Sequence, residues 1–246
     1  MTKDQPETQP SGLPRLSRHQ VWKMFDRIAG RYDLLNHLLS AGLDYRWRAE
    51  VARMLPSGLS LAVLDLACGT GDQLIALAKT GRVSRGNGLD LAEQMLAIGR
   101  AKIKRQKLDQ VLELQIGDAE KLAFDDNAFD TVTISFGIRN MTDTRRTLAE
   151  MLRVLKPRGR ALILEFSVPP SPLVRGSYMF YLRHVMPRLG ALISGDSTAY
   201  RYLSETIETF PYGDAFCGMM REAGFAQVNA TTLTGGIVTI YSGDKS

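Results

Sequence analysis

The sequence predicts an α/β protein built on a doubly wound parallel sheet, and three observations lead to this prediction. The apolar run 61–64 is typical of a buried parallel strand, and a G-x-G turn and a helical pattern over 72–78 follow it. Strand-like and helix-like segments then alternate without a break as far as residue 166. The connections between them are short, as in parallel sheets made of repeated βα units.

The segment 17–58, which precedes the first strand, is predicted to be helical. Ser17 with Gln20 three residues later matches a capping box at the start of a helix. Apolar and aromatic side chains then recur at helical spacing at Val21, Phe25, Ile28 and Tyr32. A further helix is expected over 47–55, with Asp44 as its N-cap. These helices could cover the mouth of the sheet.

The remaining elements follow in order along the chain. The expected strands are 61–64, 85–89, 111–116, 129–135, 160–166, 226–233 and 236–242. The expected helices between them are 72–78, 92–106, 144–155 and 213–223. The stretch 156–159 reads as a turn that closes a helix, because it contains Pro157 and Gly159. The segment 167–213 interrupts the alternation with prolines and many aromatic residues, and an insertion of this length is expected to form a functional cap.

Bulk properties place the chain among ordinary globular proteins. It has 246 residues, of which 44% are hydrophobic and 23% charged, and its mean hydropathy is −0.12. Residues 1–16 hold three prolines among polar residues and are expected to be a flexible tail, which leaves 17–246 as a single domain. No signal peptide is visible and no apolar run reaches the roughly 18 residues of a membrane span. We therefore expect a cytoplasmic protein.

Charge and cysteine content narrow the expected partners. The net charge is +5 and the pI about 9.3, which would suit either nucleic acid or an anionic membrane surface. No nucleic-acid recognition motif accompanies the charge, so nucleic acid is not expected as a partner. The two cysteines, Cys68 and Cys217, predict neither a disulfide framework nor a metal site.

Acidic residues at the ends of three expected strands indicate a ligand site. Parallel strands present ligands at their carboxyl ends, where Asp65, Asp90 and Asp118 lie together with the glycine turn of Gly69 and Gly71. Asp90 follows this turn at about 20 positions, the spacing at which a carboxylate meets the ribose hydroxyls of a nucleotide. Each acid taken alone could equally be a helix cap.

The ligand expected at this site is an adenosyl compound without phosphates. A dinucleotide fingerprint requires a third glycine or an alanine, and Leu74 occupies that position. A phosphate-binding loop would end in a lysine followed by serine or threonine, which is also missing. S-adenosylmethionine satisfies these conditions and is the expected cofactor.

Longer motifs resemble those of one methyltransferase family. The stretch 63–72 is similar to motif I of class I S-adenosylmethionine-dependent methyltransferases. Four further stretches, 25–33, 134–140, 150–157 and 200–211, resemble the ubiquinone/menaquinone biosynthesis C-methyltransferase family from about Arg18 onward. Two positions depart from the family pattern, because Ala123 stands where proline is common and Arg158 where glycine is common.

The resemblance implies a Rossmann-like, seven-stranded sheet whose last strand is antiparallel. It also implies cofactor contacts from Thr70, Asp90, Asp118, Ala119 and Ser135. The implied reaction is C-methylation of a polyprenyl quinol, with demethylmenaquinol as the preferred acceptor and menaquinol as the product.

Carbon is a weak nucleophile unless a neighbouring oxygen donates electrons into the ring, so the site must stabilise a phenolate or remove its proton. Arg139, which follows the fourth strand, is expected to hold the phenolate or a water, and Asn140 is expected to orient it. A guanidinium is permanently protonated, so Arg139 is not expected to be the base. Substrate-pocket candidates are Tyr32, His184, Tyr200 and Tyr202.

Two other functions are compatible with parts of the pattern. One is a class I methyltransferase that acts on another hydrophobic acceptor, such as a sterol or a phenolic compound. The other is a dehydrogenase or binding module on the same sheet, which the missing third glycine argues against. A polyprenyl quinol resides in the bilayer, so we also expect peripheral contact with the inner face of a membrane. The oligomeric state is left open.

Overall fold

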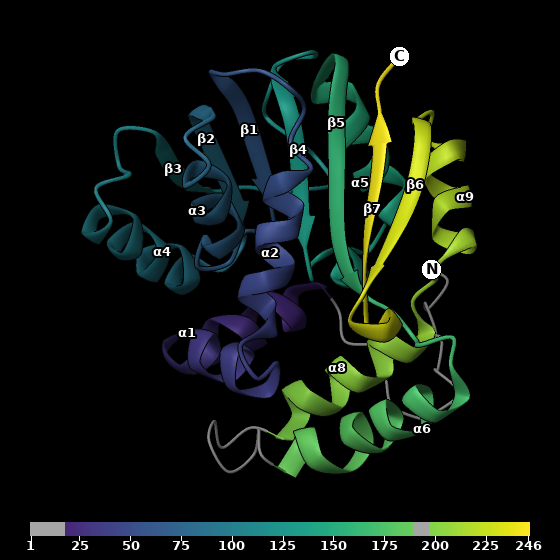
Figure 1. Cartoon of the computed structure of the whole chain (residues 1–246). Coiled ribbons are helices and arrows are strands. Elements are labelled where there is room, and N and C mark those ends of the chain that lie inside the picture. The colour runs from purple at the N-terminus through teal and green to yellow at the C-terminus, as the bar shows by residue number, and fades with distance from the viewer. Residues whose placement is uncertain (1–17, 189–196) are drawn as a thin grey trace, which may run out of the picture.

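The computed structural model describes residues 18–188 and 197–246, and Figure 1 shows their arrangement. The expected tail 1–16 and the serine of the expected capping box, Ser17, lie outside the described residues. A seven-stranded sheet in the order β3-β2-β1-β4-β5-β7-β6 forms the centre. Its strands are β1 (Leu61–Leu66), β2 (Val83–Asp90), β3 (Leu112–Ile116), β4 (Phe129–Ser135), β5 (Leu155–Phe166), β6 (Ala226–Leu233) and β7 (Val238–Asp244).

Strands β1 to β5 run parallel, whereas β7 is antiparallel to both of its neighbours, β5 and β6. The predicted seven-stranded sheet with an antiparallel last strand is therefore confirmed. Every residue of β1 is buried, as expected for a strand covered on both faces. This arrangement brings the carboxyl ends of the parallel strands together at the lower edge in Figure 1.

Strand β5 begins earlier than the sequence predicts. Phe129 pairs with Leu155 and Thr131 with Arg160, so the stretch 156–159 is a bulge in the paired strand and not a turn that precedes it. Arg158 adopts φ 65° in this bulge, a left-handed conformation that favours glycine. The bulge keeps the strand pairing continuous although extra residues are inserted.

Helices cover both faces of the sheet. The helices α3 (Asp72–Ala78) and α4 (Glu93–Arg105) pack on one face, where Leu74, Leu77 and Leu96 belong to the same core cluster as Val63 of β1. The helices α5 (Thr144–Val154) and α9 (Asp214–Glu222) pack on the other face against a larger core cluster. Neighbouring residues of β1 thus face opposite layers, which is the alternation expected of a doubly wound sheet.

Two N-terminal helices precede the sheet, α1 (Arg18–Leu39) and α2 (Leu43–Arg53). Asp44 is not the N-cap of α2, because it lies inside the first turn and Gly42 precedes the helix with φ 74°. The Asp44 side chain instead turns toward α1 and accepts hydrogen bonds from His37 and Ser40. The N-cap prediction was therefore wrong, since the short turn between the helices lets Asp44 reach back to α1.

The expected cap consists of α6 (Pro172–Phe180), the π-helical turn η2 (Tyr181–Val185) and α8 (Ser197–Thr209). Together with α1 these helices lie below the carboxyl ends of the parallel strands (Figure 1). A separate cluster of buried side chains joins α1 to the cap through Leu35, Tyr178, Leu182, Met186 and Ile207. Among the described helices, none combines the length and the apolar character that crossing a membrane requires.

Candidate active site

A hollow opens at the carboxyl ends of β1, β2 and β4. Four of the residues predicted to bind the cofactor line it, namely Gly69, Asp90, Ala119 and Ser135. Gly69 and two further lining glycines, Gly117 and Gly137, keep parts of its wall free of side chains. A Cβ on Gly137 would lie 2.7 Å from the Cβ of Ala67, so only glycine fits there without a shift.

Asp90 supplies a partly buried carboxylate to this hollow. Its side chain accepts backbone hydrogen bonds from Gly69 at 2.8 Å and from Ala92 at 2.9 Å. These bonds fix the carboxylate between the glycine turn and the start of α4. Burial raises the pKa of Asp90, and the backbone N–H groups oppose that rise. A carboxylate held in this way is a suitable acceptor for the two hydroxyl groups of a ribose.

The other predicted cofactor residues lie around the hollow but do not line it. Asp65 is buried and accepts a hydrogen bond from the hydroxyl of Thr133 at 2.6 Å. The Thr70 hydroxyl donates to Asp33 at 2.6 Å and accepts from Lys102 at 2.9 Å. Gly71 precedes α3 with φ 79°, and the Asp118 carboxylate accepts from the backbone of Glu120. The structure thus gives these residues roles in shaping the walls.

A second cavity of about 360 Å³ lies between the sheet and the cap. Its wall is mainly apolar and aromatic, with Leu39, Trp47, Phe166, Leu182, Met186 and Ile207 among its lining residues. Tyr32 and Phe136 line both this cavity and the hollow, so the two spaces adjoin. This volume falls within the range of small-molecule sites.

Arg139 lies in the 3₁₀ turn η1 (Ile138–Asn140) and lines the second cavity. One guanidinium nitrogen, Nη1, bonds Glu165 Oε1 at 2.6 Å and the backbone oxygen of Phe136 at 2.6 Å. The side chains of Arg139 and Glu165 are only 6% and 1% exposed. Burial raises the pKa of Glu165, although the adjacent guanidinium opposes that rise. This buried ion pair fixes the position of Arg139.

Three buried polar atoms at the second cavity have no hydrogen-bond partner within the described part of the chain. They are Arg48 Nε, Arg139 Nε and the hydroxyl of Tyr178, and all three residues line the cavity. Buried polar groups are rarely left unpaired, because an unsatisfied donor or acceptor costs free energy. The three atoms therefore indicate a ligand that carries oxygen atoms on an otherwise apolar body.

The remaining predicted residues have different positions. Asn140 lines the hollow, and its side-chain oxygen accepts from the Tyr202 hydroxyl of α8 at 3.2 Å. Tyr32 separates the two spaces, and burial raises the pKa of its hydroxyl. His184 is exposed and packs beside Phe180, so the structure does not place it with the cavity residues. Tyr200 belongs to α8, but its side chain lies outside the described part of the chain.

The sequence-based prediction missed two residues that line the second cavity, Arg48 and Tyr178, and it also missed Glu165, which pairs with Arg139 behind the cavity wall. Glu165 left a visible signal, because it is a charged residue inside the apolar run of an expected central strand. The sequence around Arg48 and Tyr178 carries no comparable signal. Aromatic side chains in a helix usually pack in the core and basic ones usually face solvent, so neither residue indicates a binding site.

The residues of the hollow fit an adenosyl ligand. The glycine walls admit a close approach, and Asp90 supplies a fixed hydroxyl acceptor. No group of three or more potential metal ligands occurs within residues 18–188 and 197–246.

The fold recurs among solved methyltransferases. A SAM-dependent methyltransferase from Thermotoga maritima superimposes with a TM-score of 0.63 at 18% identity, covering 92% of this chain and 100% of that one. Phosphoethanolamine N-methyltransferase 2 of Haemonchus contortus, in complex with S-adenosyl-L-methionine, gives 0.67 at 15% identity, covering 95% of this chain and 61% of that one. Fold and hollow together define the class I S-adenosylmethionine-dependent methyltransferases.

Sequence relatives narrow the class to one family. The model of the ubiE/COQ5 methyltransferase family matches residues 14–245. A protein of Citrifermentans bemidjiense named ubiquinone/menaquinone biosynthesis C-methyltransferase UbiE is 44% identical over 92% of this chain and 96% of its own length. The demethylmenaquinone methyltransferase of Clavibacter sepedonicus is 44% identical over 92% of this chain and 90% of its own. The chain belongs to the ubiE/COQ5 methyltransferase family, and is an S-adenosylmethionine-dependent C-methyltransferase.

Proposed function

We propose that the chain methylates a ring carbon of a polyprenyl quinol, with demethylmenaquinol as its preferred acceptor. The observation that carries this proposal is the second cavity, which adjoins the hollow and combines apolar walls with three unpaired polar atoms. A quinol ring with its prenyl tail has matching chemistry, because it joins two oxygen atoms to an apolar body. The named relatives of this chain act in quinone biosynthesis, which supports the same choice.

The ring must be turned toward the hollow, where S-adenosylmethionine supplies the methyl group as a sulfonium when bound. Phe136 and Tyr32 line both spaces and would position the ring at the junction. Apolar walls exclude water. The stabilisation of negative charge that develops on the ring oxygen therefore depends on the fixed hydrogen-bond donors of the cavity. Positioning of this kind contributes much of the rate of a methyl transfer.

Arg139 stabilises the quinol oxygen as that oxygen loses its proton. Its Nη1 is held by Glu165 and Phe136, which leaves Nε, buried and unpaired, as a donor at the cavity. The Tyr178 hydroxyl is a second donor, and burial raises its pKa, so it remains protonated. Asn140 connects the turn of Arg139 to α8 through Tyr202 and keeps the cap aligned with the sheet.

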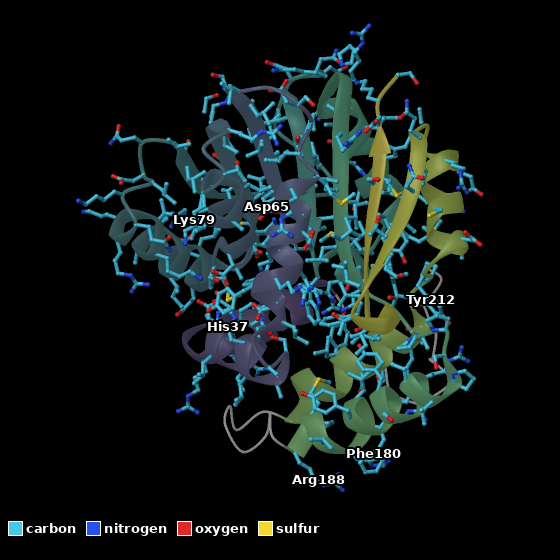
Figure 2. All side chains as sticks on the ribbon, viewed as in Figure 1. His37, Asp65, Lys79, Phe180, Arg188 and Tyr212 are labelled. Atoms are coloured by element: carbon cyan, nitrogen blue, oxygen red, sulfur yellow. The ribbon has the colours of Figure 1, made fainter. Side chains whose placement is uncertain are left out.

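We also assign membrane contact to the outer face of the cap. Val174, Ser177 and Tyr178 on the inner side of α6 line the acceptor cavity. On the outer side, Leu173 and Phe180 are 81% and 62% exposed. Figure 2 shows Phe180 and Arg188 directed outward at the lower end of the molecule. Exposed apolar residues beside basic ones suit an anionic bilayer, from which a lipid acceptor could enter the cavity.

Replacing Arg139 tests its proposed role. Arg139→Ala removes the donor to the developing phenolate, so we expect kcat for demethylmenaquinol to fall about 100-fold or more. The dissociation constant for S-adenosylmethionine, measured by calorimetry, should stay within about threefold of wild type, because the guanidinium lies outside the hollow. Turnover like that of wild type would rule out this role.

A second variant separates catalysis from folding. Arg139→Ala leaves the Glu165 carboxylate buried without its cation, which costs about 3–5 kcal/mol of stability. The double variant Arg139→Ala with Glu165→Gln removes that charge and should recover thermal stability. Its kcat should remain low, since no donor has been restored.

A further inference from the structure

We propose that Asp44 is the general base that accepts the quinol hydroxyl proton, and that His37 and Ser40 position its carboxylate. This inference rests on the proposed function, because it requires a hydroxyl-bearing ring in the second cavity. Asp44 lies in the first turn of α2 and lines the cavity, as Arg139 and Tyr178 do.

Asp44 is the only carboxylate among the described residues that line this cavity. Arg48 and Arg139 also line it, but a guanidinium does not release its proton in proteins. No histidine belongs to the described lining either. Asp44 is thus the cavity group best suited to take a proton at neutral pH.

Hydrogen bonds from His37 and from Ser40, which also lines the cavity, hold the carboxylate of Asp44. Asp44 is 3% exposed. Its Oδ2 lies 2.7 Å from Nδ1 of His37, and its Oδ1 accepts from the Ser40 hydroxyl at 2.8 Å. Both partners come from the end of α1 and the turn after it, where Gly42 with φ 74° reverses the chain. Each carboxylate oxygen keeps a further lone pair for a proton from the cavity.

His37 links this buried carboxylate to a polar groove on the other side of α1. The imidazole stacks on Tyr45 with ring centroids 4.2 Å apart, and the side chain is 22% exposed. The groove is also lined by Asp72, Lys79, Lys102 and Arg105. Figure 2 shows His37 on the upper side of α1, away from the cap. His37 therefore acts through Asp44 and not on the substrate.

The proton and electron balance of the step is complete without another reactant. The O–H bond of the quinol breaks, an O–H bond forms on Asp44, and the electron pair stays on the ring oxygen beside Arg139. The ring carbon then forms its bond to the methyl group as the carbon–sulfur bond breaks, and the electron pair of that bond stays on sulfur. Loss of the proton from the methylated ring carbon to water restores the aromatic ring, and Asp44 returns its proton to the ring oxygen. One proton is released per turnover.

Charged and titratable groups surround the proposed base on every packed element. Arg48 shares helix α2 with it, and Arg139 lies on the sheet side. Tyr32 and His37 belong to α1, and the cap contributes the hydroxyls of Tyr178, Tyr181 and Tyr202. Two of these groups, Arg48 and Arg139, are cations that line the same cavity as Asp44.

The test is the pH dependence of turnover in Asp44→Asn, with demethylmenaquinol as substrate. Asparagine keeps the shape of the side chain but cannot accept the proton. We expect kcat at pH 7 to fall about 100- to 10,000-fold. The remaining kcat should rise about tenfold per pH unit toward pH 10, because a phenolic hydroxyl then ionises without a base. The KM for the quinol and the affinity for S-adenosylmethionine should change less than about threefold.

Glu50→Gln is the matched control, because Glu50 lies on the same helix and pairs with Arg53 at the surface. Its turnover should equal that of wild type. A kcat of Asp44→Asn near wild type, or a lowered kcat that does not rise with pH, would overturn the assignment. If wild-type protein methylates no quinol at all, the proposed function itself fails, which is a distinguishable result.

The positioning role is tested with His37. His37→Ala should lower kcat and shift its pH profile to higher pH, whereas His37→Gln should recover part of the rate because its amide can still donate to Asp44. These two His37 variants also test the role of Asp44 as the base if Asp44→Asn does not bind S-adenosylmethionine. Equal, wild-type-like pH profiles in both His37 variants would contradict the proposal.

Discussion

Asp65, one residue before the end of β1, shows how strongly burial acts on a single carboxylate beside the site. It is 1% exposed, and its hydrogen bond from the Thr133 hydroxyl does not compensate for the lost water. Burial raises its pKa to about 7. Its protonation therefore changes near neutral pH, within the working range of an enzyme.

We predict that Asp65→Asn is more stable than wild type above pH 7. The folded protein binds the Asp65 proton more tightly than the unfolded chain, so stability falls as pH rises from about 4 to about 7. The loss of stability reaches at most about 4 kcal/mol, because the pKa of Asp65 differs by about three units between the folded and the unfolded chain. Denaturant unfolding at pH 5 and pH 8 should show this decline in wild type and a smaller one in the variant. An identical pH dependence in both proteins would contradict the prediction.

Only part of the site could be predicted at the residue level. The carboxyl ends of β3 and β4 have the predicted positions, whereas β1 and β2 extend one or two residues further. Gly69, Asp90, Ala119 and Ser135 line the hollow. Which way a strand-end acid points was not predictable, and Asp65 faces the interior of the protein. The N-cap role predicted for Asp44 was wrong, because its partners at the end of α1 and in the following turn reach it only when the two helices are folded together.

Glycines determine how closely neighbouring elements approach the site. A Cβ on Gly99 of α4 would lie 2.5 Å from Leu114 and 3.0 Å from the backbone oxygen of Thr70 in the glycine turn. Gly218 of α9 is also helical, yet a Cβ there would have no atom within 4 Å. The same substitution should thus have opposite effects in the two helices.

We expect Gly99→Ala to lower the free energy of unfolding by about 1–3 kcal/mol, because overpacking displaces α4 from the glycine turn. The affinity for S-adenosylmethionine should fall with it. Gly218→Ala should raise stability by about 0.5–1 kcal/mol, since alanine favours helices. Thermal unfolding and calorimetric titration check both variants. Stabilisation by Gly99→Ala would refute the proposed close packing.

Most of the elements could be predicted because the periodicity of the sequence and the local signals agree. The helix 72–78 and the strands 129–135 and 226–233 have the predicted bounds. The start of β5 was not predictable from local signals, because Pro157 and Gly159 resemble a turn while long-range pairing with β4 carries the strand through them. Tertiary pairing thus overrode the local preference at this position.

At the scale of the whole molecule, helix α6 lines the acceptor cavity with one side and exposes apolar residues on its other side. A lipid acceptor could therefore move from a bilayer into the cavity without crossing water. We predict that the protein sediments with vesicles containing phosphatidylglycerol and less with vesicles of phosphatidylcholine alone, because basic side chains accompany the apolar face. Added salt should weaken this binding.

The double variant Leu173→Ser with Phe180→Ser should bind these vesicles at least about tenfold more weakly, since each side chain loses apolar area that would be buried. Leu59→Ser is the control, because Leu59 is 78% exposed but precedes β1 at the opposite end of the sheet. Equal binding of both variants would mean that the cap is not the docking face.

The most direct test of quinol methylation is a competition between three acceptors for the purified protein. Methyl-labelled S-adenosylmethionine is incubated with equal amounts of demethylmenaquinol, a sterol and a phenolic acid under reducing conditions, and the products are separated by chromatography. We expect label in menaquinol, and none when the quinol is replaced by its oxidised quinone, which has no hydroxyl proton to lose. Label in the sterol or the phenolic acid, or transfer to the quinone, would contradict this expectation.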